Sequence, residues 1–283
     1  MITGLDHAVV VVRDIEAGVA AYRSLFARAP AWRAEADGAA TALFTLDNTT
    51  LELIAPNADA ESGNRIRAVL DAQGEGLASI CFRTGDIARM HRRLDRLALK
   101  PAPVSEAQSR DIGSGAVLRW KRTRTETEAT RGVRLFFLER LVERPLSPAA
   151  GTAPIAALDH VVIATGDPER AAALYGARLG LDMALDRSHP DWGRLMFFRC
   201  GGTVVEIVHR PGGTLDAGQD KLSGLCWRVA DMDAARARLL ANGIDVSDVR
   251  TGRKPGTRVL TVRNGTCGVL TLLMEQTPRA TEQ

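Results

Sequence analysis

Gly4-Leu-Asp-His-Ala-Val-Val-Val-Val-Arg-Asp-Ile15 is the stretch that decides the fold, because it recurs as Ala157-Leu-Asp-His-Val-Val-Ile-Ala-Thr-Gly-Asp-Pro168. In both copies an apolar run typical of a β-strand follows Leu-Asp-His, and an aspartate lies seven residues after the histidine. Asp14 and Asp167 fit as helix N-caps, and Pro168 takes the favoured first helical position. Each copy therefore predicts a strand followed by a capped amphipathic helix.

Two weaker copies of this pattern follow at 77–87 and 222–232, each with an aspartate at the same place. After every predicted helix come strand-like runs separated by glycine, asparagine or aspartate turns. The repeating unit is thus one strand, one helix and about three strands (βαβββ), used four times along the chain. This internal periodicity predicts an α+β architecture.

The spacing of the repeats predicts two domains. The segment 144–154 is rich in proline, alanine and small polar residues, which is typical of a linker. It separates an N-terminal domain, 1–143, from a C-terminal domain, 155–276, and leaves a tail at 277–283. The first domain contains modules 1–60 and 75–143, and the second contains modules 155–212 and 220–276.

Composition argues against several classes of partner. The 283 residues carry a net charge of +3, and the basic residues are spread along the chain rather than gathered into a nucleic-acid-binding stripe. No apolar run approaches the roughly 20 residues that cross a bilayer, and the N-terminus lacks the pattern of a secretory signal. The 4 cysteines are widely separated, as expected for reduced core residues. We therefore expect a soluble, cytoplasmic protein that binds neither nucleic acid nor membranes.

A histidine and a glutamate recur at matching positions and form the strongest functional signal. His7 and His160 lie in the first strands, and Glu52 and Glu206 each interrupt an apolar strand 45 and 46 residues later. A carboxylate in an apolar strand is costly to bury unless it is paired, hydrogen-bonded or bound to a metal. Imidazole nitrogen with carboxylate oxygen suits Zn, Mn, Fe, Co or Ni. The alternative for each copy is a core histidine and an edge glutamate without a metal.

With these motifs the chain resembles the vicinal oxygen chelate (VOC) superfamily, which includes glyoxalase I, bleomycin-resistance proteins, methylmalonyl-CoA epimerase and extradiol dioxygenases. The resemblance rests on the Leu-Asp-His strand, the Asp-capped helix and the final Leu-Glu-Leu or Val-Glu-Ile strand. It implies modules paired into cupped mixed sheets around a concave pocket, where a divalent metal binds two vicinal oxygens of a small-molecule substrate. It also implies His7, Glu52, His160 and Glu206 as metal ligands, with Glu52 or Glu206 as the catalytic base.

The second and fourth modules depart from the family's pattern. The ligand position of the first strand holds Ser79 or Gly224, and that of the last strand holds Phe136 or Leu272. Three arrangements are therefore open: modules one and three converge on one four-ligand site, a homodimer completes two sites, or the metal is partly or wholly lost. The resemblance disfavours an extradiol dioxygenase. In that branch it implies a metal-binding triad of two histidines and one glutamate, with the second histidine and the glutamate in the last module, where this chain has Gly224 and Leu272.

Strand alternation excludes three other residues from the candidate site. Glu139 and Glu275 each lie three residues after the ligand position of a last strand, and His209 lies three residues after Glu206. Successive side chains of a strand point to opposite faces, so an odd spacing moves a residue to the other face. We expect all three to face away from the site.

Two smaller groups are candidates for a substrate pocket. His189 and Trp192 lie between the helix and the later strands of module three, where the resemblance implies pocket-lining residues, although the same stretch fits an ordinary turn. Arg122 and Arg124 could hold an anionic group such as a carboxylate or phosphate. Alternatively, they form a solvated strand rim with Glu126 and Glu128 as partners.

Two functions follow from the resemblance. The first is a glyoxalase-like lyase or isomerase that acts on a small oxygenated metabolite through a divalent metal serving as a Lewis acid. The second is a metal-free small-molecule-binding or resistance protein that sequesters its ligand in the cupped pocket. Retention of a stoichiometric metal separates the two.

Overall fold

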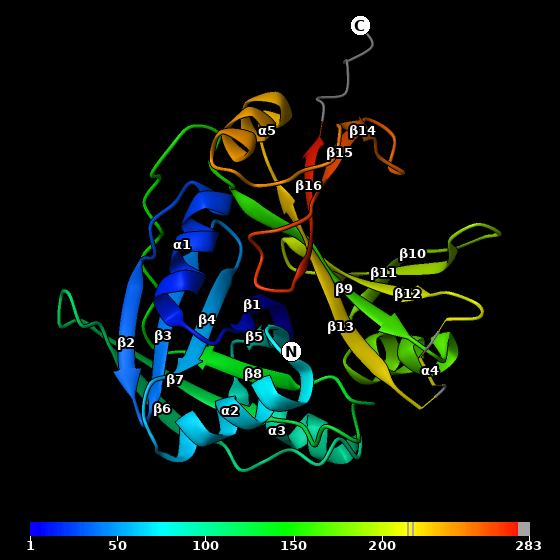
Figure 1. The fold of residues 1–283 in the computed structure, drawn as a ribbon. Helices are drawn as coiled ribbons and strands as arrows, with labels where there is room; N and C mark the ends of the chain where they lie inside the picture. The colour runs from blue at the N-terminus through cyan, green and yellow to red at the C-terminus, as the bar shows by residue number, and fades with distance from the viewer. Residues whose placement is uncertain (214, 217, 277–283) are drawn as a thin grey trace, which may run out of the picture.

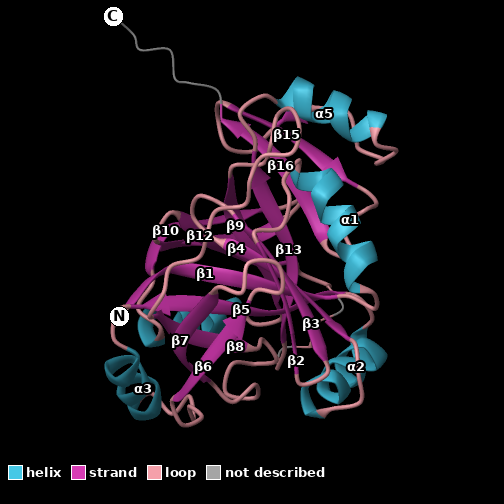
Figure 2. Cartoon of the chain, turned by 90° about the vertical axis from the view of Figure 1, so that its left-hand side faces the viewer, coloured by secondary structure: helices cyan, strands magenta, loops and turns pink. Residues whose placement is uncertain are grey.

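The computed structural model describes residues 1–213, 215–216 and 218–276. They form two eight-stranded mixed sheets, one from each half of the chain, and the helices pack on these sheets (Figures 1 and 2). In Figure 1 the first half runs from blue to green and the second from green to red. The tail expected at 277–283 lies outside the described residues.

The first sheet contains strands β1 to β8 in the order β2-β3-β4-β1-β5-β8-β7-β6. Its strands are β1 Ile2–Val11, β2 Trp32–Ala36, β3 Ala39–Thr45, β4 Thr50–Pro56, β5 Gly76–Thr84, β6 Ser105–Arg110, β7 Val117–Arg124 and β8 Leu135–Arg140. The helices of this half are α1 Ile15–Phe26, α2 Glu61–Gln73 and α3 Ile87–Arg96.

The second sheet repeats this arrangement in the order β10-β11-β12-β9-β13-β16-β15-β14. Its strands are β9 Ala157–Thr165, β10 Asp182–His189, β11 Gly193–Cys200, β12 Thr203–His209, β13 Asp220–Arg228, β14 Arg250–Thr251, β15 Thr257–Val262 and β16 Leu270–Gln276. The helices of this half are α4 Pro168–Ala172, which continues as the π-helix η1 Ala173–Arg178, and α5 Met232–Ala241.

The identical strand orders confirm the α+β fold of four βαβββ modules in two cupped sheets. Within a module the first and last strands are parallel, as for β1 with β4 and β5 with β8. The first strands of two modules then pair antiparallel, β1 with β5 and β9 with β13. Modules one and two therefore share a sheet, and modules three and four share the other.

Aspartate caps begin one helix in each module, as the repeat predicts. Each carboxylate accepts a hydrogen bond from the backbone N–H three residues later, at 2.8–3.1 Å, in Asp14, Asp86, Asp167 and Asp231. The structure adds α2, which lies between the first two modules and was not part of the predicted unit. Among the described helices, none is long and apolar enough to cross a membrane.

Each sheet has two different faces. Ala8 and Val10 belong to the main hydrophobic core together with Tyr22 of α1, and Val161 and Ile163 of β9 belong to the same core. The alternating residues of these strands, beginning with His7 of β1 and His160 of β9, point to the opposite side. We call the side that carries His7 or His160 the cup face.

The two halves share one core and pair their helices across it. Phe26 of α1 packs edge to face on Trp227 of β13, with 4.7 Å between the ring centroids. Arg238 of α5 donates hydrogen bonds to two carbonyls near the end of α1. In the same way Arg93 of α3 and Arg178 of η1 bind backbone carbonyls of each other's segments. The halves are thus joined through α1 with α5 and through α3 with η1.

The segment 144–154 is packed rather than a free tether. Arg28 donates hydrogen bonds to the carbonyls of Ser147, at 2.7 Å, and Ile155, at 2.6 Å. The hydroxyl of Ser147 is buried and accepts a hydrogen bond from the backbone N–H of Thr45. The composition of this segment indicates a connection between the halves, but these contacts fix its path along the first half.

The first cup is closed at its ends. Strands β2 and β6, which stand at opposite ends of the sheet order, meet through a hydrogen bond from the indole Nε1 of Trp32 to Ser109 Oγ at 2.9 Å. Trp32 also forms a buried apolar cluster with Leu43 and Leu118. Helix α2 covers another part of the same cup face, where it packs its buried side chains on Val11 of β1. Much of the first cup is therefore filled by the protein itself.

The second cup is more open. By strand register Leu185 pairs with Phe197, which pairs with Glu206, so Leu185 lies on the cup face, where it is 49% exposed. Leu270 lies on the same face of β16, next to Gly224, and is 69% exposed. Large apolar side chains exposed inside a concave sheet are typical of a surface that receives a ligand.

Candidate functional site

Strand register brings the two residues of each predicted pair into contact. In the first sheet Val9 of β1 stands beside Glu52 of β4. His7 precedes Val9 by two residues on the same strand, so His7 and Glu52 are near neighbours on the cup face. The imidazole Nε2 of His7 lies 3.3 Å from Glu52 Oε2. In the second sheet Nε2 of His160 lies 3.0 Å from Glu206 Oε2. The recurring spacing in the sequence therefore corresponds to two histidine–glutamate pairs, one in each cup.

Behind each histidine stands the aspartate that precedes it in the sequence. Nδ1 of His160 lies 2.8 Å from Asp159 Oδ2, so the imidazole bridges two carboxylates. Burial alone lowers the pKa of His160, but the hydrogen bonds to Asp159 and Glu206 and the charges of both raise it to about 9. At neutral pH His160 is therefore an imidazolium that donates one proton to each carboxylate.

The first sheet surrounds its aspartate differently. Asp6 is completely buried and contacts Arg140 Nε at 2.6 Å, Arg144 Nη1 at 3.0 Å and Arg83 Nε at 3.3 Å, besides Nδ1 of His7 at 2.7 Å. Burial alone raises the pKa of Asp6, but Arg144, the hydrogen bond to His7 and Arg140 hold it well below its usual value. In this cup arginines, and not the histidine alone, balance the buried aspartate.

Arg144 is a residue of this cluster that the sequence did not reveal. The sequence places Arg144 in the linker, yet its side chain is only 8% exposed and lies against Asp6 and His7. Its partners lie 138 and 137 residues earlier in the chain, so no local pattern marks it. A basic residue at the start of a proline-rich segment carries no signal of such a contact.

The other positions named by the family pattern also reach the cup faces, but with side chains that bind no metal. Ser79 pairs with Val9, and Phe136 pairs with Cys81, which pairs with His7. The same register in the second sheet places Gly224 and Leu272 at the equivalent positions. Each cup therefore combines one histidine and one glutamate with one small and one apolar residue.

These residues do not fit the divalent metal that the resemblance implies. Each cup offers one imidazole nitrogen and one carboxylate, whereas protein sites for such metals use about three or four protein ligands. Within residues 1–213, 215–216 and 218–276, no group of three or more His, Cys, Asp or Glu side chains could hold a metal. The two pairs also belong to separate sheets, so modules one and three do not form a shared four-ligand site.

Glu139 and Glu275 face away from the cups, as strand alternation predicts. Glu139 Oε2 accepts a hydrogen bond from the backbone N–H of Ile87 at 2.8 Å, at the start of α3. Glu275 Oε1 accepts one from Met232 N at 3.1 Å, at the start of α5. A carboxylate at a helix N-terminus is stabilised by the unpaired N–H groups there, so both glutamates anchor a helix to its sheet.

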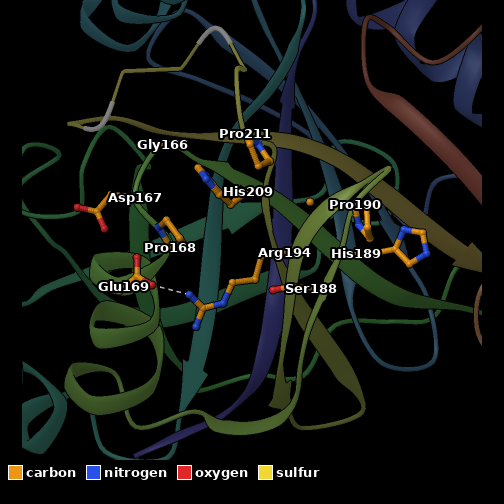
Figure 3. Close-up of a pocket in the computed structure, with 11 residues that line it drawn as sticks. Gly166, Asp167, Pro168, Glu169, Ser188, His189, Pro190, Arg194, His209 and Pro211 are labelled. Atoms are coloured by element: carbon orange, nitrogen blue, oxygen red, sulfur yellow. Dashed lines mark hydrogen bonds and ion pairs between the residues drawn. The ribbon is translucent and has the colours of Figure 1, made fainter.

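His209 is directed away from Glu206 and lines a separate cavity. Its Nδ1 lies 3.1 Å from the carbonyl oxygen of Thr165. The cavity, of about 730 Å³, lies beside the start of α4 and contains neither His160 nor Glu206 (Figure 3). Arg194 crosses it to form an ion pair with Glu169 at 2.6 Å. His189, at the end of β10, also lines this hollow, which therefore reaches the rim of the second cup but does not include its histidine–glutamate pair.

Arg122 and Arg124 lie on the cup face of the first sheet. Arg124 pairs with Phe136 in the strand register, and both arginines are exposed. Neither side chain has an ion pair or hydrogen bond to another described residue. Of the two partners expected in a solvated rim, Glu126 and Glu128, the first pairs instead with Lys100 at 2.6 Å. The two arginines are therefore available to an anion at this end of the cup.

His189 and Trp192 lie at the turn between β10 and β11. Their rings stack in parallel, with 4.5 Å between centroids and 5° between planes. Arg253, from the loop between β14 and β15, places its guanidinium carbon 4.9 Å from the centroid of the Trp192 ring. The turn expected between two strands therefore carries an aromatic surface that contacts the opposite end of the same sheet.

Comparisons with known proteins agree with the two-domain organisation. A family model described as a glyoxalase-like domain matches residues 5–157. A second, described as the glyoxalase/bleomycin resistance protein/dioxygenase superfamily, matches residues 159–261. The ethylmalonyl-CoA/methylmalonyl-CoA epimerase of Cereibacter sphaeroides is 36% identical over 100 residues, which cover 32% of this chain and 75% of the epimerase.

Solved structures share the fold over nearly the whole chain. A triple mutant of 4-hydroxymandelate synthase from Streptomyces coelicolor superposes with a TM-score of 0.74 at 15% identity, covering 98% of this chain and 93% of the other. The Mn(II)-bound glyoxalase from Novosphingobium aromaticivorans superposes with a TM-score of 0.65 at 14% identity, covering 98% and 83%. At these identities the likeness concerns the fold alone.

Proposed function

The chain belongs to the glyoxalase/bleomycin resistance protein/dioxygenase superfamily, and from this premise we propose that it is an acid–base lyase or isomerase acting on a small oxygenated metabolite. We assign the reaction to the cup face of the second sheet, with Glu206 as the base and His160 as the hydrogen-bond donor. The observation that carries the proposal is the chain of hydrogen bonds Asp159–His160–Glu206 on an open cup face.

The second cup is favoured over the first by access and by charge. In the first cup an apolar cluster and α2 occupy much of the cup face. In the second cup Leu185 and Leu270 leave apolar surface exposed beside the pair. His160 also carries a positive charge at neutral pH, because two carboxylates hold its pKa at about 9 against the effect of burial. A fixed positive charge is what a developing oxyanion requires.

The proposed step moves one proton and creates one oxyanion. The Glu206 carboxylate removes a proton from a carbon next to a carbonyl, and the bonding electrons pass to the carbonyl oxygen. As Glu206 becomes neutral, Nε2–H of His160 is released to donate to that oxygen, while Asp159 holds Nδ1–H. Return of the proton to carbon completes an isomerisation, and departure of a neighbouring group completes an elimination. A positioned base contributes about 10²–10⁴-fold to such a rate.

The name of the epimerase from Cereibacter sphaeroides, which is similar to part of this chain, supports this reaction class. An epimerase inverts a stereocentre, and proton removal next to the thioester carbonyl of an acyl-CoA is one route to that result. For this chain the same chemistry would use the imidazolium of His160 to meet the negative charge. The donor set does not fit a metal, so no step of the proposal passes through one.

Deuterium uptake tests the proposal directly. The protein is incubated with methylmalonyl-CoA in D₂O, and mass spectrometry follows exchange at the carbon next to the thioester. We expect exchange with the natural chain, a loss of about 10²–10⁴-fold in Glu206→Gln, and near-normal rates in the matched variant Glu52→Gln. Loss in Glu52→Gln alone would move the reaction to the first cup. Absence of exchange across a panel of acyl thioesters and 2-oxo acids would contradict the proposal.

Elemental analysis tests the metal-free form of the proposal. The natural chain, His7→Ala and His160→Ala are purified without a His-tag and analysed for Zn, Mn, Fe, Co and Ni. We expect less than one tightly held metal per chain and no difference among the three proteins. A stoichiometric metal that His160→Ala removes would replace the imidazolium with a metal ion as the oxyanion partner.

The second candidate function is a metal-free binding protein. Phe136 and Leu272 favour it, because an apolar residue stands in each cup where the family pattern has a second glutamate. A cup with one carboxylate and apolar walls can hold a ligand without reacting with it. The two functions separate cleanly in the exchange experiment, since a binding protein retains its ligand in Glu206→Gln and exchanges no proton in either form.

A further inference from the structure

The ring of Trp192 lies close to two arginine side chains, Arg187 and Arg253. Its ring stacks on His189, and two guanidinium carbons lie near its centroid, that of Arg253 at 4.9 Å and that of Arg187 at 5.7 Å. Both distances fall within the range of a cation–π contact. His189 has one acidic neighbour, Asp191, whose carboxylate lies 3.7 Å from its Nδ1.

The arginines of this cluster lack acidic partners. Neither Arg187 nor Arg253 forms an ion pair in the part of the chain that the structure describes. Two positive charges gathered on one indole repel each other, and the ring face offsets only part of that repulsion. An anion between them would complete the cluster, and guanidinium groups bind phosphate oxygens with paired hydrogen bonds.

The cluster stands at the mouth of the second cup. Arg187 pairs with Leu195 in the strand register, and Leu195 pairs with Val208, which shares the cup face with Glu206. Arg253 comes from the loop after β14, and β10 and β14 are the two ends of the sheet order. Trp192 and Arg253 therefore join opposite ends of the cup by side chains.

The same loop reaches toward the proposed reaction site. Lys254 follows Arg253, and its charge acts on Asp159: burial raises the pKa of Asp159, but His160, Arg228 and Lys254 together lower it. The strand register aligns Arg187 with Ala164 of β9, which lies on the same face as His160, so a ligand that touches Arg187 at the mouth can extend along the cup face to His160. In the first cup the corresponding strand ends are joined instead by the Trp32–Ser109 hydrogen bond.

We propose that Arg187 and Arg253, arranged around Trp192, form a subsite for a phosphate or pyrophosphate group at the far end of the substrate. This inference rests on the proposed function only in placing the reacting end at His160 and Glu206. The ring of Trp192 adds a surface on which a planar base can stack once the ligand displaces one of its present neighbours. The substrate class is thus a phosphate-bearing carrier or phosphate ester whose oxygenated end lies deeper in the cup.

Equilibrium binding of two probes tests the subsite. Isothermal titration with pyrophosphate and with ADP is performed on the natural chain, on Arg187→Gln/Arg253→Gln, and on Arg119→Gln/Arg110→Gln as a control that removes two charges from the first sheet. We expect saturable binding to the natural chain and the control, and a loss of at least about tenfold in the first double variant. Tighter binding of ADP than of pyrophosphate, reduced in Trp192→Leu, would identify a nucleotide carrier; equal binding would identify a simple phosphate ester.

Two results would overturn the inference: no saturable binding of either probe at millimolar concentration, or equal binding by the natural chain and Arg187→Gln/Arg253→Gln. Thermal unfolding of each variant checks that it is folded. The test is independent of the exchange reaction. Arginine-dependent binding without proton exchange would refute the proposed function and keep the subsite. Proton exchange without binding of either probe would refute the subsite and keep the proposed function.

Discussion

Asp6 and Asp159 precede the two histidines at equivalent positions, yet the Asp6 side chain is completely buried while that of Asp159 is 22% exposed. Asp6 contacts three arginines, whereas Asp159 has one arginine neighbour, Arg228, at 3.6 Å. The same local sequence thus produces two electrostatic environments. This difference leads to predictions that separate the two cups.

Removing the charge of Asp6 should destabilise the protein strongly. Asp6→Asn leaves Arg140 and Arg144, each 8% exposed, without their buried counter-charge. Breaking a buried ion pair from one side costs about 3–5 kcal/mol of unfolding free energy. The matched change Asp159→Asn should cost less, because Arg228 is 40% exposed and can be solvated. Urea unfolding measures both, and equal losses would contradict this account.

Stability should fall as the pH rises above neutrality because of His160. Its pKa is raised in the folded protein from 6.5 to about 9, so its contribution is complete below about pH 6.5 and disappears as the pH passes 9. The total change in unfolding free energy is on the order of 3 kcal/mol. Urea unfolding between pH 6 and 9.5 provides the measurement. His160→Gln, which does not titrate, should show a flatter profile, and an identical slope would argue against the imidazolium.

Restoring the missing donors should create a metal site in the first cup. Ser79→His with Phe136→Glu adds an imidazole and a carboxylate on the face that carries His7 and Glu52. The first cup is chosen because a Cβ at Gly224 would come within 2.7 Å of the Leu270 carbonyl oxygen. We expect about one Co²⁺ per chain, with a visible d–d spectrum, and no such spectrum for the natural chain. Equal Co²⁺ binding by the two proteins would show that the number of metal-binding side chains in the cup does not determine whether a metal is bound.

The contact between Phe26 and Trp227 should contribute to the unfolding free energy of both halves of the chain together. Phe26→Ala removes a fully buried ring from the shared core, which costs about 3–5 kcal/mol. Phe136→Ala, the same change at a partly exposed ring on the cup face, should cost less. Unfolding followed by fluorescence should show a single transition at a lower urea concentration in Phe26→Ala. Two separate transitions in the natural chain would contradict a common core.

What the sequence predicted best are the features that depend on neighbours along the chain. An aspartate before an amphipathic stretch is sufficient to begin a helix, and all four predicted caps are present. Alternation along a strand is sufficient to turn Glu139 and Glu275 away from the cups. The matching histidine and glutamate positions fall on adjacent parallel strands, so a regular spacing becomes a contact.

Features that depend on contacts between distant parts of the chain could not be predicted from the sequence pattern. The four first strands are alike in pattern, so nothing in them specifies that β1 pairs with β5 rather than with β9. Arg144 reaches Asp6 only because the chain folds back along the first half. The contact of Trp192 with Arg253 likewise depends on the curvature of a whole sheet. Helix α2 lies between the first two modules, outside the βαβββ repeat, so the repeat does not predict it.

Helices that pair across the shared core tie two similar halves into one polypeptide. In an assembly of identical subunits, every mutation is copied into each pocket by symmetry. In a single chain that contains both halves this constraint is absent. Substitutions that fill the pocket of one half therefore leave the pocket of the other half unchanged. The two cups already differ in this way, because an apolar cluster and α2 cover much of the first whereas Leu185 and Leu270 are exposed in the second.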